Sequence, residues 1–129
     1  MLLRVLVVSL ASLLLACGAA EPAPASAVVM SQNGLVEAVV HFEGPIERGD
    51  NSLLVELRPQ RGDAAASLTA VDAVMPAHTH HAHAGAIEPT EQGFRARELD
   101  LYMTGRWQLE LQLELGAQQD TVRMPVDVP

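Results

Sequence analysis

Cysteine, lysine and the usual catalytic motifs are absent or nearly absent from this chain of 129 residues. Its single cysteine, Cys17, excludes a disulfide within the chain. Eight arginines against sixteen acidic residues give a net charge of −8, which argues against nucleic acid as a partner. Such a charge would favour binding of a cation or a basic partner, or would serve only to keep the protein soluble. There is no Gly-x-Ser-x-Gly sequence and no phosphate-binding loop, and we predict that the protein is not an enzyme.

The first residues have the pattern of an export signal. Arg4 precedes a continuous apolar run, Val5–Ala16, which is shorter than the ~20 residues that span a bilayer and has the length of a signal-peptide core. The run ends in "LLAC", which resembles the lipobox of bacterial lipoproteins. We therefore predict that residues 1–16 are a cleaved signal helix and that Cys17 becomes the acylated N-terminus.

A short segment rich in proline and alanine follows the cysteine. Residues 17–27 show no hydrophobic period and predict a disordered tether between lipid anchor and folded domain. Lipid chains contribute ~0.8 kcal/mol per buried methylene, enough together to hold the protein at a membrane. We expect a periplasm-facing protein of the bacterial cell envelope. Because Gly18 is not an inner-membrane retention signal, the outer membrane is favoured over the inner.

Alternation of apolar and polar residues dominates the rest of the chain. In Trp107–Leu115 the tryptophan and four leucines share one face, as in a half-buried antiparallel strand. Thr121–Val128 alternates in the same way and predicts the second strand of a hairpin, with Pro125 placing it at an edge or a bulge. Similar runs predict the strands Leu35–Gly44, Ser52–Pro59, Ser67–Met75 and Gly93–Met103, with a shorter one at Ala86–Thr90.

No helical pattern follows the signal segment. About seven short strands with turn residues between them predict one all-β domain, residues 28–129, folded as an antiparallel sandwich. Trp107 is expected in its core.

The most distinctive stretch is "VMPAHTHHAHAG", Val74–Gly85. It follows a predicted strand and carries four histidines: His78, His80, His81 and His83. On an extended backbone the first two point one way and the last two the other, and same-face neighbours lie ~6.6 Å apart along the chain, so two imidazoles can converge on one ion. Imidazole suits copper, zinc and nickel, whereas thioether sulfur favours Cu(I).

Two methionines extend this candidate metal site. Met75 lies at the entry of the histidine stretch, and Met103 would join it if the fold brought the two ends together. A mixed set of nitrogen and sulfur ligands suits copper better than zinc. Two alternatives stay open from the sequence: a polar loop that needs no metal, and a pH-sensing loop, because imidazoles titrate near neutrality. His41, within a strand pattern, is expected to be structural.

Three segments resemble the YtkA-like domain, a family related to the FixH-like and CopC proteins. They are "GPIERGDNSLLVEL", "MPAHTHHAH" and "GFRARELDLYMTGRWQLEL". The resemblance implies an immunoglobulin-like sandwich, export, and a role in copper handling or terminal oxidase assembly. The chain differs from the common family pattern in carrying His78 where a second methionine is usual, which argues against a site made of methionine alone. The matching positions are Gly49, Asn51, Met75, Pro76, His78, His80, Met103, Gly105 and Trp107.

Together these features predict an exported, lipid-anchored protein that binds a transition metal, copper before zinc, through a His/Met cluster. It would act as a carrier or buffer, with a membrane metalloenzyme or a metal-efflux protein as partner. The alternative is an accessory or structural lipoprotein whose sandwich docks a partner protein and whose histidines are incidental.

The lipid anchor predicts a simple fractionation result. Cys17→Ser removes the sulfur that would carry the lipid, so the variant should leave the membrane fraction and change its electrophoretic mobility. A variant that stays with the membranes at unchanged mobility would show that Cys17 is not lipidated.

Overall fold

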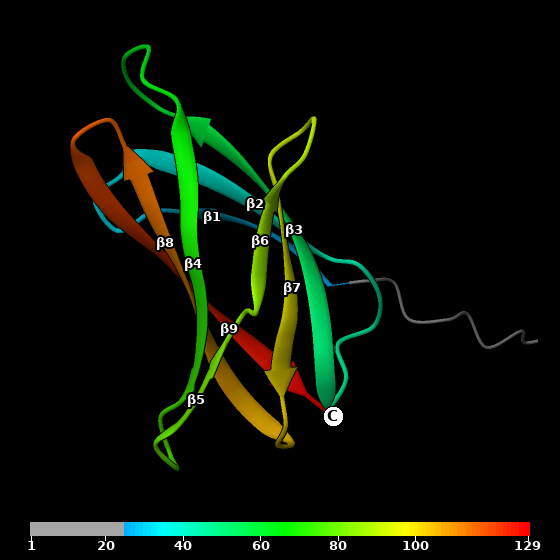
Figure 1. Cartoon of the computed structure of the whole chain (residues 1–129). Coiled ribbons are helices and arrows are strands. Elements are labelled where there is room, and N and C mark those ends of the chain that lie inside the picture. Colours follow the sequence, from blue (N-terminus) through cyan, green and yellow to red (C-terminus); the bar gives the residue numbers. More distant parts are fainter. Residues whose placement is uncertain (1–24) are drawn as a thin grey trace, which may run out of the picture.

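The computed structural model describes residues 25–129, which form two antiparallel sheets packed face to face (Figure 1). The five-stranded sheet has the order β1-β2-β3-β7-β6, and the four-stranded sheet the order β5-β4-β8-β9. In chain order the strands are β1 (Ser26–Met30), β2 (Val36–Phe42), β3 (Gly49–Pro59), β4 (Ala66–Met75), β5 (His80–His83), β6 (Ala86–Pro89), β7 (Phe94–Leu101), β8 (Gly105–Leu115) and β9 (Gln118–Val128).

The predicted all-β sandwich is confirmed, with nine strands where about seven were expected. One addition is β1, which begins at Ser26, two residues before the expected start of the domain, and pairs with β2. The other is β5, which was expected to be loop and pairs with β4. The signal segment, Cys17 and the tether up to residue 24 lie outside the described residues. The described part contains no helix long and apolar enough to cross a membrane.

Alternating side chains build the core between the sheets. The β8 residues expected to face inward are buried, and Trp107 is fully enclosed. Leu111 lies between Val71 of β4 and Val122 of β9, and all three are buried. Apolar burial of this kind is the main stabilising contribution to a fold of this size.

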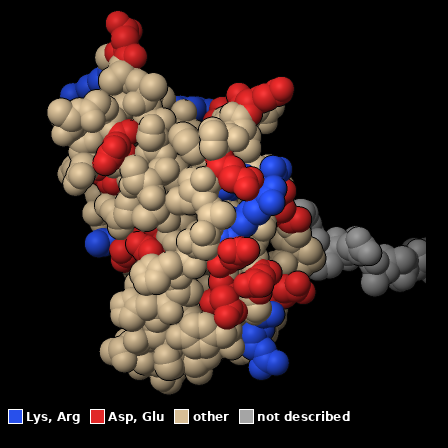
Figure 2. Space-filling view, viewed as in Figure 1, with Lys and Arg blue, Asp and Glu red and all other residues tan. Residues whose placement is uncertain are grey.

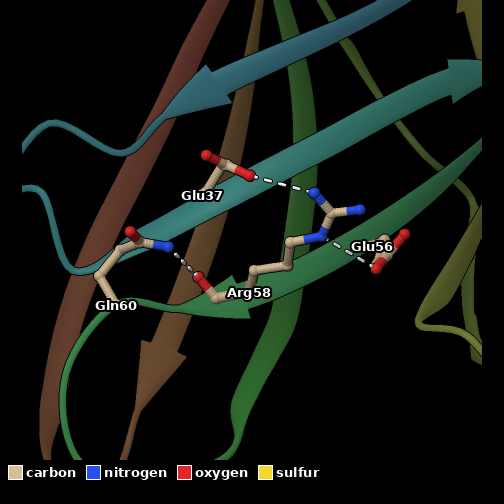
Figure 3. A network of polar contacts seen from close by, with 4 residues as sticks. All are labelled: Glu37, Glu56, Arg58 and Gln60. Carbon is tan, nitrogen blue, oxygen red and sulfur yellow. Dashed lines mark hydrogen bonds and ion pairs between the residues drawn. The ribbon is translucent and has the colours of Figure 1, made fainter.

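Ion pairs lie mostly on the outer faces. Arg58 of β3 donates to Glu56 at 3.0 Å and to Glu37 of β2 at 3.2 Å, and its carbonyl oxygen accepts a bond from Gln60 at 3.0 Å (Figure 3). The Arg58 side chain is half exposed, so water screens these ion pairs. The pair with Glu37 joins β2 to β3, whereas Glu56 lies on the same strand as Arg58, and both pairs contribute little beside the core.

Asp120, at the start of β9, ties the turn between β1 and β2 to the other sheet. Its carboxylate accepts bonds from the backbone N–H groups of Thr121 at 2.8 Å, Asn33 at 3.0 Å and Leu35 at 3.4 Å. Burial of the carboxyl acts to raise its pKa, but bonds from the Ser31 hydroxyl and from these N–H groups outweigh it, so the pKa lies below its usual value. Asp120 therefore stabilises the fold as a charged group.

The core arrangement predicts unequal costs along one strand. Leu111→Ala should lower the free energy of unfolding by ~2–5 kcal/mol, because it leaves a cavity between β4 and β9. Glu114→Ala, at an exposed position of the same strand, should cost well under ~1 kcal/mol. Urea unfolding of both variants measures the difference, and equal midpoints would contradict the burial of the leucine face.

Asp120 predicts a pH dependence of stability. Its folded pKa lies below the unfolded value of about 3.9, so its contribution is complete above that value and is lost as the pH falls through the folded pKa. Asp120→Asn should lower the unfolding free energy near neutral pH by ~1–3 kcal/mol. It should also flatten the loss of stability in acid. Urea midpoints at neutral and acid pH test both points, with the exposed Asp63→Asn as control; an unchanged acid profile would contradict the prediction.

Candidate metal site

The histidine stretch forms a hairpin between β4 and β5. Its connection, Pro76–Thr79, begins with a turn in which the His78 N–H donates to the Met75 carbonyl at 3.2 Å. Pro76 fits the second position of such a turn because its ring fixes φ. Thr79 closes the loop in the left-handed region, with φ 54°. The chain therefore reverses within four residues, and His80 comes to lie opposite Met75.

The strand register decides which way each histidine faces. Met75 pairs with His80, and Ala73 pairs with Ala82. Met75, Ala73 and Ala82 are buried and His80 is half-buried, so these side chains lie on the inner face of the sheet. Directly opposed side chains in an antiparallel pair have Cβ atoms ~4.5–5.5 Å apart. His80 and Met75 are therefore immediate neighbours at the end of the sandwich.

Aromatic rings continue from His80 toward the core. The ring centroids of His78 and His80 are 5.9 Å apart, those of His80 and Tyr102 5.6 Å, and those of Tyr102 and Trp107 5.4 Å. Tyr102 belongs to the turn between β7 and β8, which lies at the same end of the molecule as the hairpin (Figure 1). This turn thus closes the sandwich beside His80.

Both candidate methionines lie at this end. Met75 is 3% exposed, and its Cε lies 3.3 Å from where a Cβ on Gly105 would stand. Gly105 has φ +128°, which a residue with a side chain rarely adopts, so glycine meets both the backbone and the packing requirement. Met103 is half-buried against the core, and its carbonyl accepts a bond from Trp107 Nε1 at 2.9 Å. We call His78, His80, Met75 and Met103 the inner cluster.

The other two histidines lie on the opposite face of β5. His81 and His83 are exposed, on either side of the buried Ala82. His81 pairs with Val74 of β4, and His83 with Asp72. The His83 Nδ1 atom contacts Asp72 Oδ1 directly. The histidines were expected to face in two directions. In the structure His80 faces inward, His81 and His83 face outward, and His78 lies in the turn beside His80.

Among residues 25–129, no three or more His, Cys, Asp or Glu side chains are placed to hold one metal ion. The four histidines thus do not converge on a single centre in this structure. What the fold does bring together is His78, His80 and Met75, while Met103 lies in the turn between β7 and β8 at the same end of the molecule. His41 is exposed on β2, within the strand predicted for it.

Charge is sparse around the hairpin. Every residue from Ala73 to Ile87 is uncharged if the imidazoles are neutral. Figure 2 shows no acidic or basic side chain at the lower left, where the hairpin lies. A neutral set of imidazole and thioether ligands suits a soft, singly charged ion better than a hard divalent one.

Two contributing residues were missed from the sequence. Tyr102 was passed over because nothing in its neighbours marks it as a partner of His80; only the crossing from β7 to β8 brings it there. Asp72 was not among the candidate residues, and the structure sets it against His83. Centring a hairpin on Pro76–Thr79 would have revealed this pair, because residues 72 and 83 are equally far from the turn.

Comparison with known proteins gives no match: no family model, curated protein or solved structure is similar to this chain.

Proposed function

We propose that this protein binds copper at the inner cluster and acts as a carrier or buffer for the ion, exported and anchored to a membrane through Cys17. The observation that supports this most directly is the register that sets His80 beside Met75 on the inner face of the hairpin. An imidazole nitrogen and a thioether sulfur side by side are ligands that copper accepts in its reduced state.

The surroundings of these ligands support Cu(I) in particular. Met75 is almost inaccessible to water, and Met103 is held beside Trp107, so sulfur would meet the ion in a largely dry setting. Tyr102, 39% exposed, meets the His80 ring edge-on and limits access from that side. His78, in the turn, can move toward the ion without disturbing the strand pairs.

Transport or buffering fits this arrangement better than catalysis. A catalytic metal needs a firmly held set of ligands with an open position. Here His78 stands at the tip of a hairpin whose second strand pairs only with β4. The resemblance to YtkA-like domains agrees with copper handling, and a membrane metalloenzyme or metal-efflux protein is the partner we propose.

A second function has one observation in its favour. The hairpin carries no charged residue between Ala73 and Ile87, and Tyr102 beside it is exposed, as on a surface for another protein. In that case the chain would be an accessory lipoprotein that docks a partner, and its histidines would be incidental.

Competitive titration of the detergent-solubilised chain with Cu(I), against a chromogenic chelator under reducing conditions, tests the proposal. Met75→Leu/Met103→Leu should weaken Cu(I) binding by ~10–100-fold or more. Loss of a residue that only supports a metal ligand costs that much, and loss of the ligand itself should cost at least as much. Leucine nearly conserves the volume of methionine, so the fold should survive. His78→Ala/His80→Ala should weaken binding similarly, and quenching of the single tryptophan, Trp107, gives an independent readout.

Two substitutions at other exposed positions serve as controls: Met30→Leu on β1 and His41→Ala on β2, which should leave Cu(I) affinity unchanged. Unaltered affinity in the methionine pair would remove sulfur from the site. Unaltered affinity in the histidine pair as well would overturn the copper carrier and leave the accessory lipoprotein in its place.

A further inference from the structure

β5 carries a second pair of imidazoles on the outer face of the four-stranded sheet. His81 and His83 are both exposed, and Ala82 between them is 7% exposed. Burial of Ala82 fixes both histidines to the solvent side, because side chains alternate along a strand. Same-face neighbours lie ~6.6 Å apart along the strand, a separation that two imidazoles can close around one ion. We call these two residues the outer pair.

Asp72 orients one member of the outer pair. Its Oδ1 contacts His83 Nδ1, and the strand register places the two residues directly opposite each other. The His83 side chain is 73% exposed and that of Asp72 26%, so the Nε2 edge of the ring is left for a ligand from solvent. A histidine whose one nitrogen bonds a carboxylate while the other binds a metal is the usual arrangement at metal centres in proteins.

The charges around the outer pair favour a cation. Glu110 of β8 lies opposite Asp72, on the same outer face. Glu110 is engaged by Arg123 at 3.5 Å and accepts a bond from Gln108 at 3.1 Å. Asp72 contacts His83, and it faces no arginine across either neighbouring strand. Its negative charge therefore remains next to the histidine ring.

We propose that His81 and His83 form a second metal site, for a borderline divalent cation of the Cu(II), Zn(II) or Ni(II) class. The site shares no residue with the inner cluster. Two protein nitrogens leave the other coordination positions to water or to a donor from another molecule. An ion held in this way exchanges readily, and the two faces of one short strand would serve two classes of metal: divalent ions outside and a soft ion inside.

Zn(II) is the probe that separates the outer pair from the inner cluster, because zinc neither changes oxidation state nor favours thioether ligands. Calorimetric titration of the detergent-solubilised chain with zinc chloride should show one equivalent bound. His81→Ala/His83→Ala should abolish that binding, whereas His78→Ala/His80→Ala and His41→Ala should leave it intact. Asp72→Asn, which removes the charge and keeps the shape, should weaken it by ~10–100-fold.

Each result decides the proposal. Zinc binding that survives in His81→Ala/His83→Ala, or that is lost equally in His78→Ala/His80→Ala, would overturn it. Zinc-induced shifts of backbone amide NMR signals in the unaltered protein give a second test, which needs no variant, and should centre on β5 and Asp72; shifts centred elsewhere would contradict it. Binding at the inner cluster is measured with Cu(I), and binding at the outer pair with Zn(II). A negative result at one site therefore leaves the other site testable.

Discussion

The pairing of Met75 with His80 across the β4–β5 hairpin is the constraint on which the arrangement of the histidines depends. Side chains alternate along a strand, so this one pair sends His80 inward and His81 and His83 outward. A slip of one residue would exchange the two sets. Burial of Ala73 and Ala82 opposes such a slip, because it would turn an apolar pair to solvent and bring a charged or polar residue inside.

The larger elements of the fold follow from alternation that can be read directly in the sequence. Trp107–Leu115 was predictable because apolar residues alternate with glutamine or glutamate at every step, and the structure buries that apolar face. β1 was missed because its inward side chains are Ala27 and Val29, small residues continuous with an alanine-rich segment. β5 was missed because three of its four residues are histidine, which carries no strand signal.

The candidate site was only partly predictable, for a different reason. The sequence places Met75 next to the histidines, but the position of Met103 at the same end of the molecule depends on how the chain crosses from one sheet to the other between β7 and β8. The contact of Tyr102 with His80 depends on that same crossing. Contacts between segments far apart in the chain arise from packing, which no local pattern encodes. The division of the histidines, in contrast, follows from the register of one hairpin.

Position at the edge of a sheet gives β5 unusual freedom to change. It pairs only with β4, and Ala82 is its one residue in the buried core. Replacement of the exposed residues around Ala82 leaves the β4–β8–β9 pairing and the leucine face of β8 untouched. Mutation can therefore explore different side chains at this edge at little expense to folding, so the chemistry that the edge presents can diverge between descendants while the architecture persists.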